Sequence, residues 1–61
     1  MIEFPEKELF RPDELAAIFR VSKRVIYRWI ETGELEAVRI GKNTLRVKRR
    51  DAVSIVRPAI E

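Results

Sequence analysis

Residues 16–32 hold two apolar patterns that each repeat at the spacing of an α-helix, separated by only a few residues. In the second pattern, Val25, Ile26, Trp29 and Ile30 fall on one side of a helix with about 3.6 residues per turn. The opposite side carries polar and charged side chains, which are Lys23, Arg24, Tyr27 and Arg28. The chain is thereby constrained to pack two short helices across a tight turn. Trp29 is predicted to lie in the core rather than to act as a stacking platform.

Capping residues define the predicted ends of these two helices. The first is predicted over residues 12–19, because Pro12 suits the first helical turn, where its missing N–H is not needed. Ser22 is the predicted N-cap of the second helix, which runs from residue 23 to residue 31 or 32. Gly33 is predicted to end it in the left-handed conformation that glycine adopts at little cost.

After the second helix, the apolar period changes to that of a β-strand. Apolar side chains occupy alternate positions over residues 38–40 and again over residues 45–47, and residues 41–44 have the composition of a hairpin loop. The pattern predicts a two-stranded ribbon with a basic tip. Because an isolated hairpin is only marginally stable in water, this ribbon must pack against the helices. A short third helix is predicted over residues 51–56, before Pro58.

The length of 61 residues indicates a single domain, predicted over residues 10–57. Residues 1–9 are predicted to be a loosely ordered acidic lead-in, from which Phe4, Leu9 and Phe10 could still dock onto the core, and residues 58–61 a tail. The absence of cysteine and histidine excludes a disulfide framework and the usual ligands of a zinc site. The apolar runs are too short for a membrane span and no signal peptide is visible, so we expect a cytoplasmic, nucleoid-associated protein.

Positive charge is concentrated in the middle of the sequence. The net charge at neutral pH is only +3, because acidic residues predominate at both ends. Residues 20–50 carry ten basic side chains against three acidic ones, whereas residues 1–19 carry two against five. A basic segment attracts polyanions, and phosphate backbones are common among them. A solvated surface without a partner is the alternative interpretation of the same charge.

The predicted elements come in the order of a small winged helix-turn-helix domain, mostly α-helical with one β-hairpin. Residues 9–57 resemble the excisionase-type and MerR-type helix-turn-helix group. The most specific motifs are Val21-Ser22-Lys23-Arg24, Ile26-Tyr27-Arg28-Trp29-Ile30, Gly33-Glu34-Leu35 and Val38-Arg39-Ile40-Gly41. Because no long dimerising helix or effector domain is present, the chain is similar to the stand-alone members, which are excisionases and single-domain transcriptional regulators.

This resemblance implies a recognition helix at residues 22–32 in the major groove of double-stranded DNA. It implies a wing at about residues 36–48 on the adjacent backbone or minor groove. The chain also departs from the family pattern. Arg20 stands where the turn usually has glycine or asparagine, which implies a turn that is either strained or shaped differently. Arg11 and Arg50 stand at helix starts that favour capping residues, and a lost cap costs about 1 kcal/mol.

Ten residues are predicted to contact DNA. On the recognition helix, Arg24 and Arg28 lie one turn apart, and each can present a guanidinium fork to a phosphate or to guanine. Lys23 and Tyr27 are predicted to reach phosphate groups, whereas Ser22 is first a helix cap. The wing and its exit provide the remaining five, which are predicted to hold the backbone without reading sequence. They are Arg39, Lys42, Asn43, Arg46 and Lys48.

Other functions have little support in the sequence. The serines have no evident base beside them, and Gly33 and Gly41 are the only glycines, so no glycine-rich phosphate loop exists. We therefore expect a DNA-binding protein that is not an enzyme and uses no cofactor or metal. Further copies along the DNA, a recombinase and the transcription machinery are the other expected partners. The alternative is a protein-interaction adaptor whose basic face binds an acidic partner.

Overall fold

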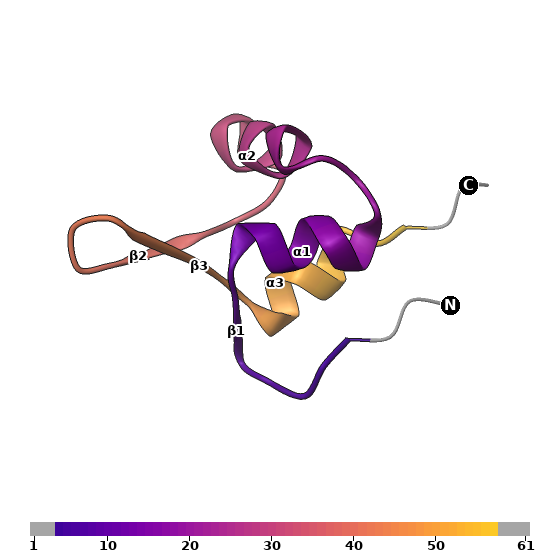
Figure 1. The fold of residues 1–61 in the computed structure, drawn as a ribbon, viewed down its shortest axis with the longest axis horizontal. Coiled ribbons are helices and arrows are strands. Elements are labelled where there is room, and N and C mark those ends of the chain that lie inside the picture. Colours follow the sequence, from indigo (N-terminus) through magenta and orange to yellow (C-terminus); the bar gives the residue numbers. More distant parts are fainter. Residues whose placement is uncertain (1–3, 58–61) are drawn as a thin grey trace.

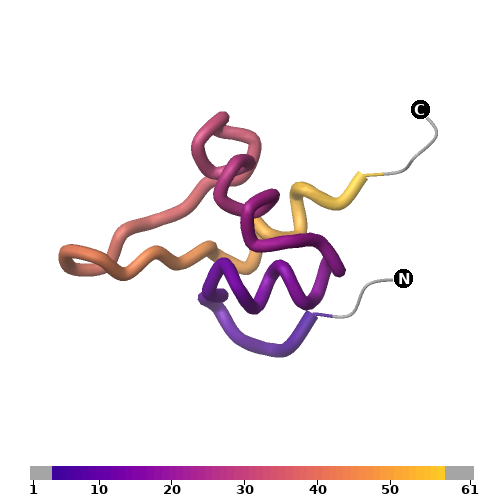
Figure 2. Tube along the Cα trace, turned by 45° about the horizontal axis from the view of Figure 1, so that its top comes forward, coloured from indigo at the N-terminus to yellow at the C-terminus, as the bar shows by residue number. Residues whose placement is uncertain are grey.

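The computed structural model describes residues 4–57, which form three helices and three short strands (Figure 1). In chain order they are β1 (Leu9–Phe10), α1 (Pro12–Phe19), α2 (Lys23–Thr32), β2 (Val38–Ile40), β3 (Thr44–Lys48) and α3 (Arg49–Ser54). The β2–β3 hairpin projects away from the helices (Figures 1 and 2). This is the winged helix-turn-helix architecture that the sequence predicts. Within residues 4–57, no helix has the length and apolar character needed to cross a membrane.

The α1 helix has its predicted bounds, and backbone groups hold both of its ends. The Arg11 side chain makes no capping bond, as expected, but its backbone N–H donates to Glu14 Oε1 at 2.8 Å. At the other end, Arg20 takes the left-handed conformation with φ 60° and ψ 45°, and its N–H donates to the carbonyls of Ala16 and Ala17. The strain implied at this turn is therefore confirmed, because a side chain disfavours this conformation.

The α2 helix is also capped as the sequence predicts. The Ser22 hydroxyl accepts a hydrogen bond from the Val25 N–H at 3.3 Å, and Gly33 ends the helix with φ 85°. The chain then turns back, since the Leu35 N–H donates to the Trp29 carbonyl at 3.0 Å. These contacts fix both ends of the helix that carries the basic face.

The sheet has one more strand than the predicted ribbon. Its strand order is β1-β3-β2 and both pairings are antiparallel. The two residues of β1 are Leu9, which lies opposite Lys48, and Phe10, which lies opposite Val47. The predicted two-stranded hairpin is confirmed as β2 and β3, and the sequence missed only β1, because two residues are too few to show a period of two.

Each element except β2 contributes to one small core. The buried apolar side chains are Phe10, Leu15, Ala16, Ile26, Leu35, Val47 and Ala52. Half-buried side chains surround them, and among these Trp29 packs edge-on against Phe19, with ring centroids 6.3 Å apart. The prediction that Trp29 belongs to the packed side of α2 is thus confirmed.

The third helix is displaced from its predicted position at residues 51–56. It begins directly after β3, because Lys48 is still extended as its N-cap and the Arg49 N–H donates to the Glu8 carbonyl at 2.9 Å. The expectation that Arg50 stands at the capping position was therefore wrong. The helix ends at Ser54, and Pro58, which was expected to stop it, lies outside the described residues.

The segment before β1 makes several contacts with the body of the domain, although the sequence predicts a loosely ordered lead-in. The Phe4 ring packs edge-on against Phe10 and Phe19, with centroids 5.9 and 5.8 Å apart. The Arg49 guanidinium donates to the Pro5 carbonyl at 2.8 Å. Of the predicted lead-in, residues 1–3 lie outside the described part of the chain.

An ion pair also connects this segment to α1. The Lys7 ammonium lies 2.5 Å from Glu14 Oε2. Together with the stronger effect of the Arg11 backbone N–H, the Lys7 contact holds the pKa of the Glu14 carboxyl below its ordinary value. The charged form of Glu14 therefore helps to hold the N-terminal segment and the start of α1 together.

Candidate nucleic-acid interface

The α2 helix presents its basic side to solvent. Lys23, Arg24, Tyr27 and Arg28 are all exposed, whereas Ile26 on the opposite side is fully buried. The sorting predicted from the helical period is therefore what the structure shows. Because α2 packs through one side only, its outer side is free along the whole length of the helix.

The charges on this side are not neutralised by neighbours. Within residues 4–57, no carboxylate lies within salt-bridge distance of Lys23, Arg24 or Arg28. The ion pairs that do occur in this part of the chain belong to Lys7 and Arg11, near α1. These basic side chains of α2 thus have no carboxylate partner in this part of the chain, which is the condition for attracting a phosphate backbone.

The wing places its predicted residues less uniformly. Lys42 and Asn43 are exposed at the tip, next to Gly41 with φ 69°. Arg39 lies opposite Leu45 in the hairpin register, so Arg39 and Arg46 project from opposite faces of the ribbon. The two predicted wing arginines are therefore not brought together.

Both wing arginines also make contacts within the wing. The Arg39 guanidinium donates to the Lys42 carbonyl at 3.3 Å, and that of Arg46 donates to the Leu45 carbonyl at 2.8 Å. Arg46 is half-buried, whereas Arg39 is exposed. Arg46 would have to give up its backbone contact to use all of its donors on another molecule.

The wing and α2 meet at a shared hollow. Tyr27 of α2 and the wing residues Asn43 and Arg46 line a surface depression of about 250 Å³. Arg11 and Asp13, at the start of α1, complete its wall. The structure thus joins predicted site residues of the helix and the wing on one concave surface. It also adds Arg11, which the sequence analysis considered only as a poor helix cap, because nothing local in the sequence relates residue 11 to residue 43.

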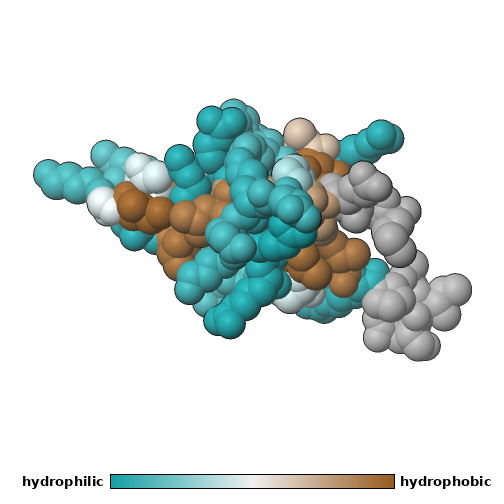
Figure 3. Space-filling model, turned by 90° about the horizontal axis from the view of Figure 1, so that it is seen from below, coloured by the Kyte–Doolittle hydropathy of each residue, from teal (hydrophilic) through white to brown (hydrophobic). Residues whose placement is uncertain are grey.

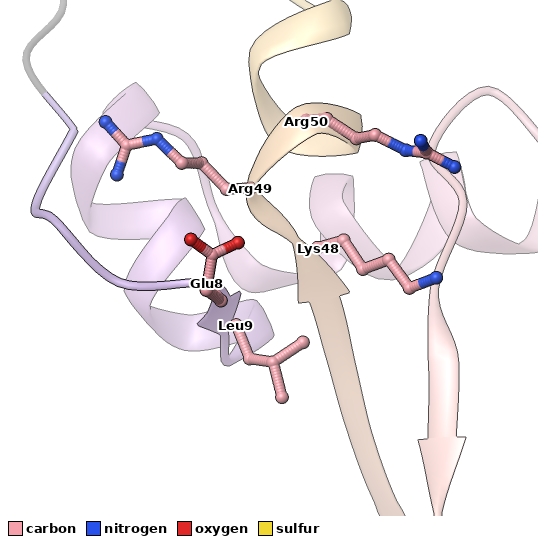
Figure 4. Close-up of a pocket in the computed structure, with 5 residues that line it drawn as sticks. All are labelled: Glu8, Leu9, Lys48, Arg49 and Arg50. Atoms are coloured by element: carbon pink, nitrogen blue, oxygen red, sulfur yellow. The ribbon is translucent and has the colours of Figure 1, made fainter.

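Lys48 occupies a different part of the surface from the rest of the predicted set. It lines a second hollow of about 380 Å³ together with Leu9, Arg50 and others at the base of the sheet. Figure 4 shows Lys48 and Arg50 pointing in the same direction, while Arg49 extends the opposite way, toward the N-terminal segment. Lys48 is not among the residues that line the hollow beside α2, although it shares a sheet face with Arg46, because it lies farther along β3, beside Leu9.

The lower side of the molecule has a different character from the α2 face. In Figure 3 an apolar band runs along the hairpin toward the body, bordered by hydrophilic residues. Leu9 and Ile40 are among the large apolar side chains exposed in the described part of the chain, with 37% and 47% of their surface accessible. The outer side of α2 instead carries three exposed basic side chains, which are Lys23, Arg24 and Arg28.

No group of three or more potential metal-ligating side chains occurs among the residues that the structure describes. The described part of the site consists of cationic side chains, one tyrosine and one asparagine, with the Asp13 carboxylate in the wall of the hollow. Such a surface can donate hydrogen bonds and attract anions.

The comparison with known proteins agrees with this architecture. Two curated relatives from Mycobacterium tuberculosis, one in each of two strains, are 47% identical to the chain over 36 residues. Each is named "Putative DNA-binding protein". The match covers 59% of this chain and 46% of each relative, so the chain spans about half the length of the relatives it matches. The profile of the helix-turn-helix domain family matches residues 9–51, and the chain belongs to that family.

Proposed function

We propose that this domain binds double-stranded DNA, with α2 in the major groove and the wing on the adjacent backbone. The observation that carries the proposal is the row of unpaired cations on the outer side of α2. A helix is about 10–12 Å wide with its side chains, and the major groove is about 12 Å wide. The buried side of α2 is occupied by the core, so the basic side is the one available to the groove.

Within this arrangement the residues of α2 have distinct roles. Arg24 and Arg28, one helical turn apart, present guanidinium forks that fit either a guanine edge or a phosphate. Lys23 lies in the first turn of the helix and binds phosphate. Tyr27, with 45% of its surface accessible, reaches toward the backbone on the side of the wing. Ser22 keeps its place as the cap that orients the first turn.

The wing contributes contacts that position the protein without reading sequence. Lys42 and Asn43 are exposed at the tip and reach backbone phosphates, and Arg39 of β2 supports them by donating to the Lys42 carbonyl. Arg46 and Lys48 remain part of the predicted set, but Lys48 reaches DNA only if the duplex extends past the base of the sheet.

Two biological roles are compatible with such a domain. One is an excision factor that bends DNA for a recombinase, and the other is a small transcriptional regulator. Further copies along the DNA would supply the specificity that one small domain lacks. A recombinase gene beside the gene for this chain would favour the excision factor over the regulator.

The first experiment measures duplex binding by fluorescence anisotropy at about 50 and 200 mM salt, with wild type, Arg28→Ala and Arg57→Ala. Arg57 is exposed after α3, so its substitution makes the same charge change outside the proposed interface. We expect steep salt dependence for wild type, and for Arg28→Ala a loss of about 1–3 kcal/mol if it reads a base. Arg57→Ala should leave the affinity near that of wild type.

Equal effects of both substitutions would show that only overall charge matters and would refute the docking geometry. Absence of binding at low salt would refute DNA binding itself. In that case the adaptor hypothesis predicts that an acidic peptide shifts the amide resonances of the same α2 residues.

A further inference from the structure

The hollow between α2 and the wing has a third wall that comes from the start of α1. Arg11 and Asp13 line it together with Tyr27 and Asn43, so three separate elements of the fold converge at this point. Arg11 belongs to neither the recognition helix nor the wing, and it is not among the ten predicted contact residues.

The Arg11 side chain takes part in two long ion pairs. Its Nε lies 3.4 Å from Asp13 Oδ1 and 3.9 Å from Glu14 Oε1, and the side chain makes no hydrogen bond within residues 4–57. Its side chain is 55% exposed. The donors of Arg11 are therefore available, and one nearby carboxylate, that of Asp13, shares the hollow with it.

The side chains that line the hollow are suited to binding a phosphate group. The Arg11 guanidinium, the Tyr27 hydroxyl and the Asn43 amide can all donate hydrogen bonds to phosphate oxygens, and the guanidinium adds a charge. Asp13 is the opposing group, because its charge repels a phosphate and holds Arg11 in the free protein.

We infer that this hollow is a subsite for one phosphate of the DNA backbone, at the junction of α2 and the wing. Arg11 is its main cation, and Asp13 is the counter-charge from which Arg11 separates when DNA binds. The inference rests on the proposed function, since the phosphate is that of the duplex held by α2. It assigns to the start of α1 a direct part in binding.

The test compares Arg11→Ala, Arg11→Lys and Asp13→Asn with Arg28→Ala and the control Arg57→Ala, each titrated with the same mixed-sequence duplex over a range of salt. Loss of one phosphate contact makes the slope of log affinity against log salt shallower by about 0.9, which we expect for Arg11→Ala. Arg11→Lys should keep the wild-type slope, because the charge remains. Asp13→Asn should bind about fivefold more tightly at low salt, as expected for removing one unit charge near a phosphate in water.

A double variant tests whether Asp13 acts by competing for Arg11. In the Arg11→Ala background, the gain from Asp13→Asn should shrink, whereas two independent effects would add. Arg11→Ala keeps the backbone N–H that donates to Glu14, so the start of α1 is retained. If this variant nevertheless fails to fold, the affinity of Asp13→Asn decides the question.

The possible failures are distinguishable. A wild-type slope for Arg11→Ala, together with a shallower slope for Arg28→Ala, would overturn the subsite and leave the proposed function intact. Unchanged affinity in Asp13→Asn would likewise overturn the role given to Asp13. If wild type shows no salt-dependent binding, the proposed function itself fails.

Discussion

The turn between α1 and α2 fixes the direction of the proposed recognition helix, and one residue holds it in an unfavourable conformation. Arg20 has φ 60° and ψ 45°, and its N–H donates to carbonyls at the end of α1. Replacing Arg20 by glycine should stabilise the domain, because glycine has no Cβ to oppose the left-handed conformation. Arg20→Ala removes the same charge and long side chain but keeps the Cβ, so it is the matched variant.

The expected size of the effect follows from two opposing contributions. The left-handed conformation costs a residue with a Cβ about 1–2 kcal/mol. Glycine also lowers the free energy of unfolding by about 0.4–1 kcal/mol, because it increases the conformational entropy of the unfolded chain. The free energy of unfolding of Arg20→Gly should therefore exceed that of Arg20→Ala by roughly 1 kcal/mol. In a domain of this size such a difference raises the midpoint of thermal unfolding by about 4–8 °C.

Circular dichroism during thermal and urea unfolding measures this difference directly. The control is Ala17→Gly, at an exposed site inside α1, where glycine should cost about 1 kcal/mol. The two glycine substitutions should thus have opposite signs. If Arg20→Gly is no more stable than Arg20→Ala, the turn does not hold residue 20 in the left-handed conformation, and the reasoning is refuted.

Two further predictions concern the N-terminal segment. Phe4→Ala should lower the free energy of unfolding by at least about 1 kcal/mol, because two edge-on aromatic pairs of about 0.5–1.5 kcal/mol each are lost. Urea unfolding measures this change, with Val53→Ala as the surface control. If Phe4→Ala is as stable as wild type, Phe4 does not dock on the core. The pKa of Glu14 is lowered in the folded state, so its contribution to stability is present above its ordinary pKa of 4.5 and is lost as the pH falls through the lower folded value. On the acid side, the free energy of unfolding should therefore change less with pH for Glu14→Gln than for wild type. Parallel curves would show that the Glu14 carboxylate does not contribute to stability.

The local pattern in the sequence was enough to predict α1 and α2. The period of α2 sorted Ile26 to the core and Arg28 to solvent, and Ser22 and Gly33 marked its two ends. These predictions succeed because helix periodicity and capping depend on residues within one or two turns of each other. The same argument explains the correct hairpin, whose strands are joined by a short loop.

The elements that were missed depend on contacts between distant parts of the chain. β1 forms because Leu9 and Phe10 pair with Lys48 and Val47 of β3. α3 begins earlier than predicted because the Arg49 N–H donates to the Glu8 carbonyl. A two-residue strand has no readable period, so only the partner strand defines it.

The candidate site divides in the same way. The basic outer side of α2 follows from charge and helical period, which are local properties of the sequence. The hollow that Arg11 shares with Tyr27 and Asn43, and the separate hollow beside Lys48, form only when the chain folds. The physical reason is that packing around a common core, rather than distance along the chain, determines which side chains become neighbours.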